Sequence, residues 1–176
     1  MSLIEQLIVV SLLGILASIP FVTGGSDRDQ LQLDASARRL QSGLDRARSI
    51  ARREQRACGL SLSEEGFTVP DAGILPASLP ACPGIGMALQ EEFEQGPVVL
   101  NTNLPPVLRF TANGLLLDGG IAVLSHERVA KARCLVVSLP LGVSRIGSYQ
   151  APLPSDGGRL LSSRCLPDLA LSEADA

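Results

Sequence analysis

Aromatic residues are scarce in this chain, and their scarcity argues against one kind of binding site. The sequence has no Trp, one Tyr and four Phe in 176 residues. Proteins that hold single-stranded nucleic acid stack the bases on aromatic side chains, so a base-stacking groove is not expected. The net charge of −3 at pH 7 does not indicate a nucleic acid or an acidic lipid as a bulk electrostatic partner either.

Residues that commonly hold metals or perform catalysis are also few. His126 is the single histidine, and no two cysteines form a C-x-x-C pair. A zinc site needs four close ligands, which this spacing does not supply. The sequence contains neither a phosphate-binding P-loop nor a G-x-S-x-G nucleophile motif. We therefore predict a protein that is not an enzyme and that uses no metal and no cofactor.

The four cysteines are Cys58, Cys82, Cys134 and Cys165. An even number of cysteines in an exported domain predicts two disulfides. Three connectivities are available. We favour Cys58–Cys82 and Cys134–Cys165 because each pair closes a local loop. Four buried free thiols are the alternative.

The first apolar segment is long enough to cross a membrane. Residues 3–22 carry one charge, on Glu5, and about twenty such residues span roughly 30 Å of hydrocarbon. The segment lacks a basic start and a small-residue cleavage pattern, so we expect it to stay in the mature protein over residues 1–23. Gly14 and Pro20 weaken this helix, and Gly24-Gly25 predicts a break before the next one.

Glu5 is the informative residue of this segment. A carboxylate in a membrane helix is costly and usually has a partner or a function. It could simply be solvated at the membrane interface. The sharper hypothesis is that it pairs with the positively charged N-terminal amine of Met1 in a neighbouring copy. That pairing would neutralise two buried charges and set the axial register of bundled helices.

The N-terminal block resembles the type IV pilin signature, whose mature form reads F-T-L-I-E-L-L-V-V-I-A-I-L-G-I-L-A. The coinciding positions are Leu3, Ile4, Glu5, Leu7, Val9, Leu13, Gly14, Ile15, Leu16 and Ala17. Met1 stands in place of the usual Phe, and the short basic leader ending in Gly is absent. We interpret the sequence as a processed form, or as one with a start codon added at the cleavage site. The resemblance implies a filament-core helix that can unwind near Gly14 and Pro20.

A second, amphipathic helix is predicted over residues 29–57. Apolar residues recur at steps of three and four and are expected to lie against a sheet: Leu33, Ala37, Leu40, Leu44, Ala47 and Ala51. Seven arginines fall outside this stripe: Arg38, Arg39, Arg46, Arg48, Arg52, Arg53 and Arg56. They could hold phosphate or a neighbour's acidic residues, but a solvated surface with local pairs to Asp45 and Glu54 is favoured.

The residues after the helix predict a β-rich domain over 58–149. Short segments of period two predict strands at 58–63, 66–69, 98–101, 107–111, 114–118, 121–125, 133–139 and 143–149. Tight turns are indicated by Asn113-Gly114 and by Asp118-Gly119-Gly120. Residues 70–97 are rich in Pro, Gly and Ala and predict a long loop. Residues 150–176 predict a loop-rich tail with a mobile end.

The helix and the late strands resemble the minor pilins and pseudopilins of the GspH/FimT type. The matching helix positions are Leu44, Ala47, Arg48, Ser49, Ala51, Arg52 and Arg53. The resemblance implies an α+β type IV pilin fold, with a long N-terminal helix packed on an antiparallel sheet. It also implies a structural subunit of a type IV pilus or a type II secretion pseudopilus. The expected partners are other pilins or pseudopilins through their N-terminal helices, the inner membrane before assembly, and the assembly platform. A single-pass inner-membrane protein with a periplasmic or extracellular domain is expected.

Two other functions are compatible with the sequence. Some members of this family bind DNA through a G-R-x-R element, which here reads Gly142-Val143-Ser144-Arg145. Arg145 keeps one of the two arginines, and Arg159 and Arg164 could supply others. DNA binding is not favoured because affinity scales with the number of phosphates neutralised. The other alternative is a membrane-anchored periplasmic domain that does not polymerise.

Overall fold

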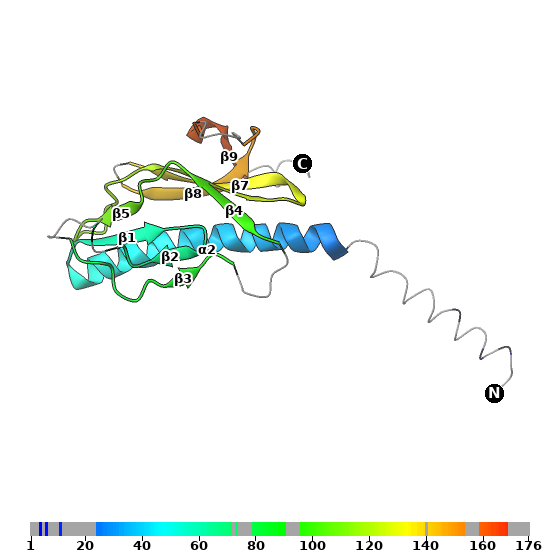
Figure 1. The fold of residues 1–176 in the computed structure, drawn as a ribbon, viewed down its shortest axis with the longest axis horizontal. Helices are drawn as coiled ribbons and strands as arrows, with labels where there is room; N and C mark the ends of the chain where they lie inside the picture. Colours follow the sequence, from blue (N-terminus) through cyan, green and yellow to red (C-terminus); the bar gives the residue numbers. More distant parts are fainter. Residues whose placement is uncertain are drawn as a thin grey trace, which may run out of the picture.

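The computed structural model describes residues 4, 6, 11, 24–71, 73, 79–90, 96–139, 141–153 and 159–168. In this part of the chain, helix α2 (Gly24–Glu54) packs against two antiparallel sheets (Figure 1). The predicted α+β class is confirmed. The predicted membrane segment, residues 1–23, falls outside the described residues except for Ile4, Gln6 and Ser11. Among the residues that are described, no helix is both long enough and apolar enough to cross a membrane.

Helix α2 buries the stripe that its sequence predicts. The six stripe residues are each at most 2% exposed: Leu33, Ala37, Leu40, Leu44, Ala47 and Ala51. The predicted break at Gly24-Gly25 is wrong, because both glycines lie within α2. Each glycine destabilises a helix by about 1 kcal/mol relative to alanine. Burial of the apolar stripe in the following turns of α2 stabilises the helix by more than this.

The end of α2 is a Schellman cap rather than the predicted continuation to residue 57. Gln55 has a left-handed backbone with φ of 50°. The amide of Arg56 donates to the carbonyl of Ala51 (3.1 Å), and that of Gln55 to the carbonyl of Arg52 (3.3 Å). These two bonds satisfy carbonyls that would otherwise lack partners at the helix end. The chain then turns directly into the first strand.

The strands form two sheets rather than one. The four-stranded sheet has the order β3-β2-β1-β5 and the five-stranded sheet the order β4-β6-β7-β8-β9. The strands of the first are β1 (Cys58–Leu62), β2 (Gly66–Thr68), β3 (Met87–Ala88) and β5 (Val107–Phe110). Those of the second are β4 (Val98–Thr102), β6 (Gly120–His126), β7 (Val129–Ser138), β8 (Val143–Tyr149) and β9 (Cys165–Pro167).

Three of the predicted segments differ from the structure. Residues 114–118 form no strand. After the turn at Gly114 the chain runs beside β5 for only a few residues and makes one isolated bridge, between Leu116 and Phe110. The predicted loop 70–97 contains β3. The predicted loop-rich tail contains the 3-10 turn η2 (Ser162–Arg164) and strand β9. Sequence periodicity carries little information on strands of two or three residues.

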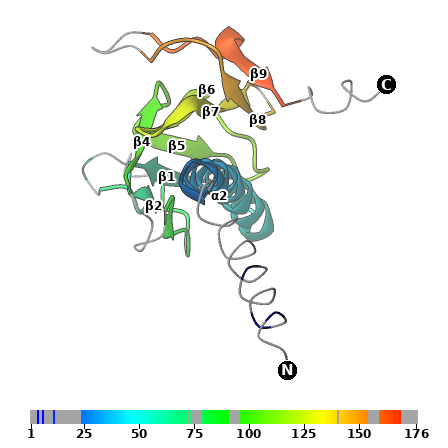
Figure 2. The same cartoon turned by 90° about the vertical axis from the view of Figure 1, so that its right-hand side faces the viewer.

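The five-stranded sheet has apolar residues on both faces. One face packs on α2 through β6, β7 and β8. The opposite face carries a second buried cluster: Ile121, Val123, Cys134, Val136, Tyr149, Leu160 and Cys165. Figure 2 shows η2 and β9 on the side of this sheet away from α2. We call the described residues 150–153 and 159–168 the strap, because they cover this outer cluster.

Two disulfides tie the loops to the sheets. Cys58 bonds Cys82 with an S–S distance of 2.00 Å, and Cys134 bonds Cys165 with an S–S distance of 2.08 Å. This is the pairing favoured from local loop closure. The first joins β1 to the segment that precedes β3, and the second joins β7 to β9. The strap is therefore covalently fixed to the sheet that it covers.

Candidate assembly and binding surfaces

The residues predicted to drive assembly lie outside the described part of the chain. They are Met1, Glu5, Gly14 and Pro20. What the structure describes is the domain to which this segment is attached, and the contacts that hold α2 in that domain. Those contacts fix the position of α2 on the sheets.

The N-terminal part of α2 is held to the five-stranded sheet by buried polar contacts. Asp29 is 6% exposed and accepts two contacts from Arg128, from Nε at 3.0 Å and from Nη2 at 3.2 Å. One turn later, Gln32 donates to the carbonyl of Gly96 at 3.1 Å. The amide of Arg128 donates to Nδ1 of His126 at 3.2 Å. The two-point contact between the guanidinium of Arg128 and the carboxylate of Asp29 fixes the orientation of the two groups as well as their distance.

Arg133 links three elements on the helix side of the same sheet. Its Nε binds Asp34 of α2. Its Nη1 donates to Ser148 of β8 (3.1 Å) and to Asp168 after β9 (2.7 Å). Sequence reasoning missed this role, although a charged residue at the start of the apolar run R-C-L-V-V was a usable signal. The end of the strap is thereby connected to the helix.

The exposed side of α2 is basic. Arg38, Arg46, Arg52 and Arg53, with Arg56 just beyond the helix, are exposed. Within the described residues none of these five makes an ion pair. Asp45 does form the predicted local pair, with Arg48 at 3.7 Å; Glu54 forms none among the described residues. Arg48 also donates to the carbonyl of Gly142.

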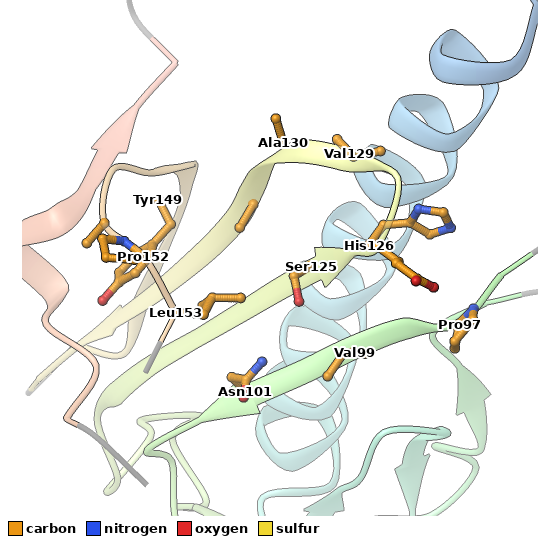
Figure 3. Close-up of a pocket in the computed structure, with 13 residues that line it drawn as sticks. Pro97, Val99, Asn101, Ser125, His126, Val129, Ala130, Tyr149, Pro152 and Leu153 are labelled. Carbon is orange, nitrogen blue, oxygen red and sulfur yellow. The ribbon is translucent and has the colours of Figure 1, made fainter. Parts of the chain in front are cut away.

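A groove of about 640 Å³ lies on the outer face of the five-stranded sheet beside the strap. Figure 3 shows Tyr149, Pro152 and Leu153 along one side and Val99 and Asn101 of β4 along the other. The short side chains of Ser125, Ala130 and Ala132 line it between them. The lining is mostly apolar, and Glu127 is its acidic residue. It could accommodate apolar groups, and no group of metal-ligating residues occurs in the described part of the chain.

The three arginines considered for DNA binding are exposed, and two of them, Arg145 and Arg164, lie apart on the sheet. Arg145 lies in β8, opposite Val136 of β7. Arg164 directly precedes Cys165, which pairs with Tyr149 at the other end of β8. At about 3.3 Å per residue, Arg145 and Arg164 are separated by roughly 13–17 Å along the strands. Arg159 is exposed in the strap. The outer sheet face between Arg145 and Arg164 is apolar, so these two do not form one basic patch.

The pair Arg109–Asp118 gives the clearest electrostatic effect. Nη2 of Arg109 contacts Asp118 at 2.7 Å and Nε does so at 3.0 Å. The side-chain hydrogen bonds from Arg109 lower the pKa of Asp118, although partial burial opposes the change. The same bonds raise the pKa of Arg109. This pair holds the segment after the Gly114 turn against β5, a structural role outside the outer groove.

The comparison with protein families gives a match over residues 36–140 to the model described as type II transport protein GspH. The chain belongs to this family. The matched segment starts in α2 and continues past the end of β7, so it includes most of the helix packing, the four-stranded sheet, and strands β4, β6 and β7 of the five-stranded sheet. Strands β8 and β9 and the strap follow it. Searches of curated proteins and of solved structures give no match. GspH proteins are pseudopilins of type II secretion, and this supports a structural subunit.

Proposed function

We propose that this GspH-family protein is a minor pseudopilin that enters a type II secretion pseudopilus through its N-terminal helix. The family match over residues 36–140 carries this proposal. The N-terminal sequence supports it, since residues 3–17 resemble the segment by which pilins pack in filaments. The residues proposed for assembly are Glu5, paired with the N-terminal amine of Met1 in a neighbour, and Gly14 and Pro20, where the helix can unwind.

The contacts of α2 suit a subunit that transmits force along a filament. Asp29 and Asp34 are bound by arginines from the five-stranded sheet, and the apolar stripe between Leu33 and Ala51 is buried. A displacement of the N-terminal segment would therefore move the helix and this sheet together. The disulfide between Cys134 and Cys165 keeps the strap in place during such a displacement.

Deleting the gene in its host tests the proposal. We expect loss or reduction of secretion by the type II system, restored by the wild-type gene, with pilus-dependent functions unchanged. Unchanged secretion together with loss of pilus-dependent motility or of DNA uptake would instead assign the chain to a pilus. A DNA mobility-shift assay with the full chain in detergent addresses DNA directly. We expect no shift at low or moderate salt, because Arg145 and Arg164 do not form one patch.

A further inference from the structure

Charge is strongly segregated along this sequence. Residues 35–56 contain seven Arg against two acidic residues, a net charge of +5. Residues 57–97 contain six acidic residues and no Arg or Lys, a net charge of −6. The whole chain has a net charge of only −3, so this separation is hidden in the overall value. Opposite charges on different parts of a surface steer association and fix its orientation.

The basic part forms a stripe along the exposed side of α2. At about 100° per residue, Arg38, Arg46 and Arg53 fall within about 80° of one another, opposite the buried apolar stripe. Ser42 and Ser49 lie between them and are exposed. We call Arg38, Arg46 and Arg53 the basic stripe. None of the three has an ion-pair partner among the described residues.

The acidic part includes exposed residues beside β2. Glu64 and Glu65 occupy the turn between β1 and β2, and Asp71 follows β2. We call these three residues the acidic flank. They also lack ion-pair partners in the described part of the chain. Figure 2 shows β1 and β2 to one side of α2.

Among the described residues, the two charged sets therefore have no ion-pair partners within one molecule. Arg39 of α2 donates to the carbonyl of Leu89 at 3.4 Å, and the amide of Leu89 donates to the carbonyl of Glu65 at 3.1 Å. Both contacts use backbone carbonyls and leave the carboxylate of Glu65 available. A second molecule can supply the missing charge to each set.

We propose that the basic stripe of one copy binds the acidic flank of a second copy, side by side. Different surfaces meet in such a contact, so it is heterologous and can repeat from copy to copy. Exposed ion pairs contribute at most about 1 kcal/mol each, and the contact is weak between free molecules. Copies held close by their N-terminal helices gain an effective concentration near the millimolar range. In that respect the inference rests on the proposed function.

A photo-cross-linker placed at Ser42, inside the basic stripe, tests the contact in the purified full chain in detergent. We expect an intermolecular cross-link to a peptide that contains residues 63–71 at about 50 mM salt, and its loss near 1 M salt, where the screening length falls to about 3 Å. The control is the same cross-linker placed at the exposed Lys131 of β7, which should give no cross-link to the peptide that contains residues 63–71. A cross-link from Ser42 to any other surface, or none, overturns the proposal.

Charge reversal distinguishes this contact from other modes of association. Arg38→Glu, Arg46→Glu and Arg53→Glu together, or Glu64→Lys with Glu65→Lys, should each weaken self-association roughly tenfold, equivalent to about 1.4 kcal/mol. Mixing the two variants should restore association, because each then meets a surface of opposite charge. Circular dichroism checks that both fold. Unchanged self-association of either variant, or a mixture that stays monomeric, contradicts the proposal. So does a wild-type chain that stays monomeric but binds duplex DNA. Normal self-association with normal secretion in a deletion strain would contradict the proposed function alone.

Discussion

Arg128 contacts both carboxylate oxygens of Asp29, at 3.0 Å and 3.2 Å, although the two residues are 99 positions apart in the sequence. Asp29 lies near the start of α2, and Arg128 lies in the turn between β6 and β7. The contact fixes the N-terminal part of the helix, which leads to the segment proposed for assembly. The pair therefore fixes the start of α2 to the five-stranded sheet.

Replacing Arg128 with alanine should destabilise the domain by about 2–3 kcal/mol. Asp29 is 6% exposed. Although the side chain of Arg128 is half exposed, its removal leaves a buried carboxylate with too few hydrogen bonds. Urea unfolding followed by circular dichroism measures the change. Glu127→Ala, at the exposed neighbouring position, is the control and should change stability by less than about 0.5 kcal/mol. Equal effects of the two substitutions would show that the pair does not hold the helix.

Gly43→Ala should destabilise the protein by about 1–2 kcal/mol, the reverse of its usual effect in a helix. Alanine is favoured over glycine by about 1 kcal/mol in an exposed helix, but a Cβ at Gly43 would overlap the ring of Phe67 in β2. Such overpacking costs about 1–3 kcal/mol. Ser42→Ala, one residue away and exposed, should be neutral or slightly stabilising. Phe67→Leu added to Gly43→Ala should recover part of the loss; no recovery would place the strain elsewhere.

Asp118→Asn should remove a contribution to stability that depends on pH. Because the hydrogen bonds from Arg109 lower the pKa of Asp118 in the folded protein, the contribution is complete above the unfolded pKa of about 3.9. It is lost as the pH falls through the folded pKa. We expect a loss of about 1 kcal/mol at pH 7, since Arg109 is half exposed. Thermal unfolding curves of the two proteins should converge at acidic pH, once the pH is below the folded pKa of Asp118; a constant difference would rule out the ionised carboxylate as the cause.

Removing the second disulfide with Cys134→Ala and Cys165→Ala should cost about 3–4 kcal/mol, because it closes a loop of 31 residues. The strap should then separate from the outer cluster around Ile121 and Val123. Hydrogen exchange would report this at the amide of Gln150, which donates to the carbonyl of Arg164. The matched control is Cys58→Ala with Cys82→Ala, which should leave exchange at Gln150 slow. Protection of Gln150 in both variants would mean that the strap is held by packing alone.

Much of the domain could be predicted because its signals are local. The stripe of α2 has a helical period, and β8 has the bounds expected from the sequence, Val143–Tyr149. The division into two sheets depends on long-range pairing, such as that of Cys58 with Phe110, which no local pattern encodes. Strand β9 has three residues, and it pairs with β8 beside the disulfide of Cys165. The sequence of β9 shows no alternation of apolar and polar residues and contains no β-branched residue. It therefore did not distinguish this strand from a loop.

The surfaces were less predictable than the fold. The seven arginines between residues 38 and 56 were evident in the sequence. Which of them are exposed and which anchor the helix depends on neighbouring segments, as for Arg48, which donates to the carbonyl of Gly142. The outer groove was not predicted, since it is formed by β4, β6, β7 and the strap, which are distant in sequence. Arg145 and Arg164 could be found by motif and composition, whereas their separation follows from strand register.

Incorporation of a Glu5→Gln variant into the pseudopilus is the most direct measurement of whether this chain assembles through its N-terminal helix. Filaments are sheared from cells that make the complete secretion system, and the chain in them is quantified against the amount in the membrane. We predict at least a tenfold loss for Glu5→Gln, because a neighbour's buried amine loses its counter-charge, and no loss for Gln6→Ala. Wild-type incorporation of Glu5→Gln would contradict assembly through Glu5.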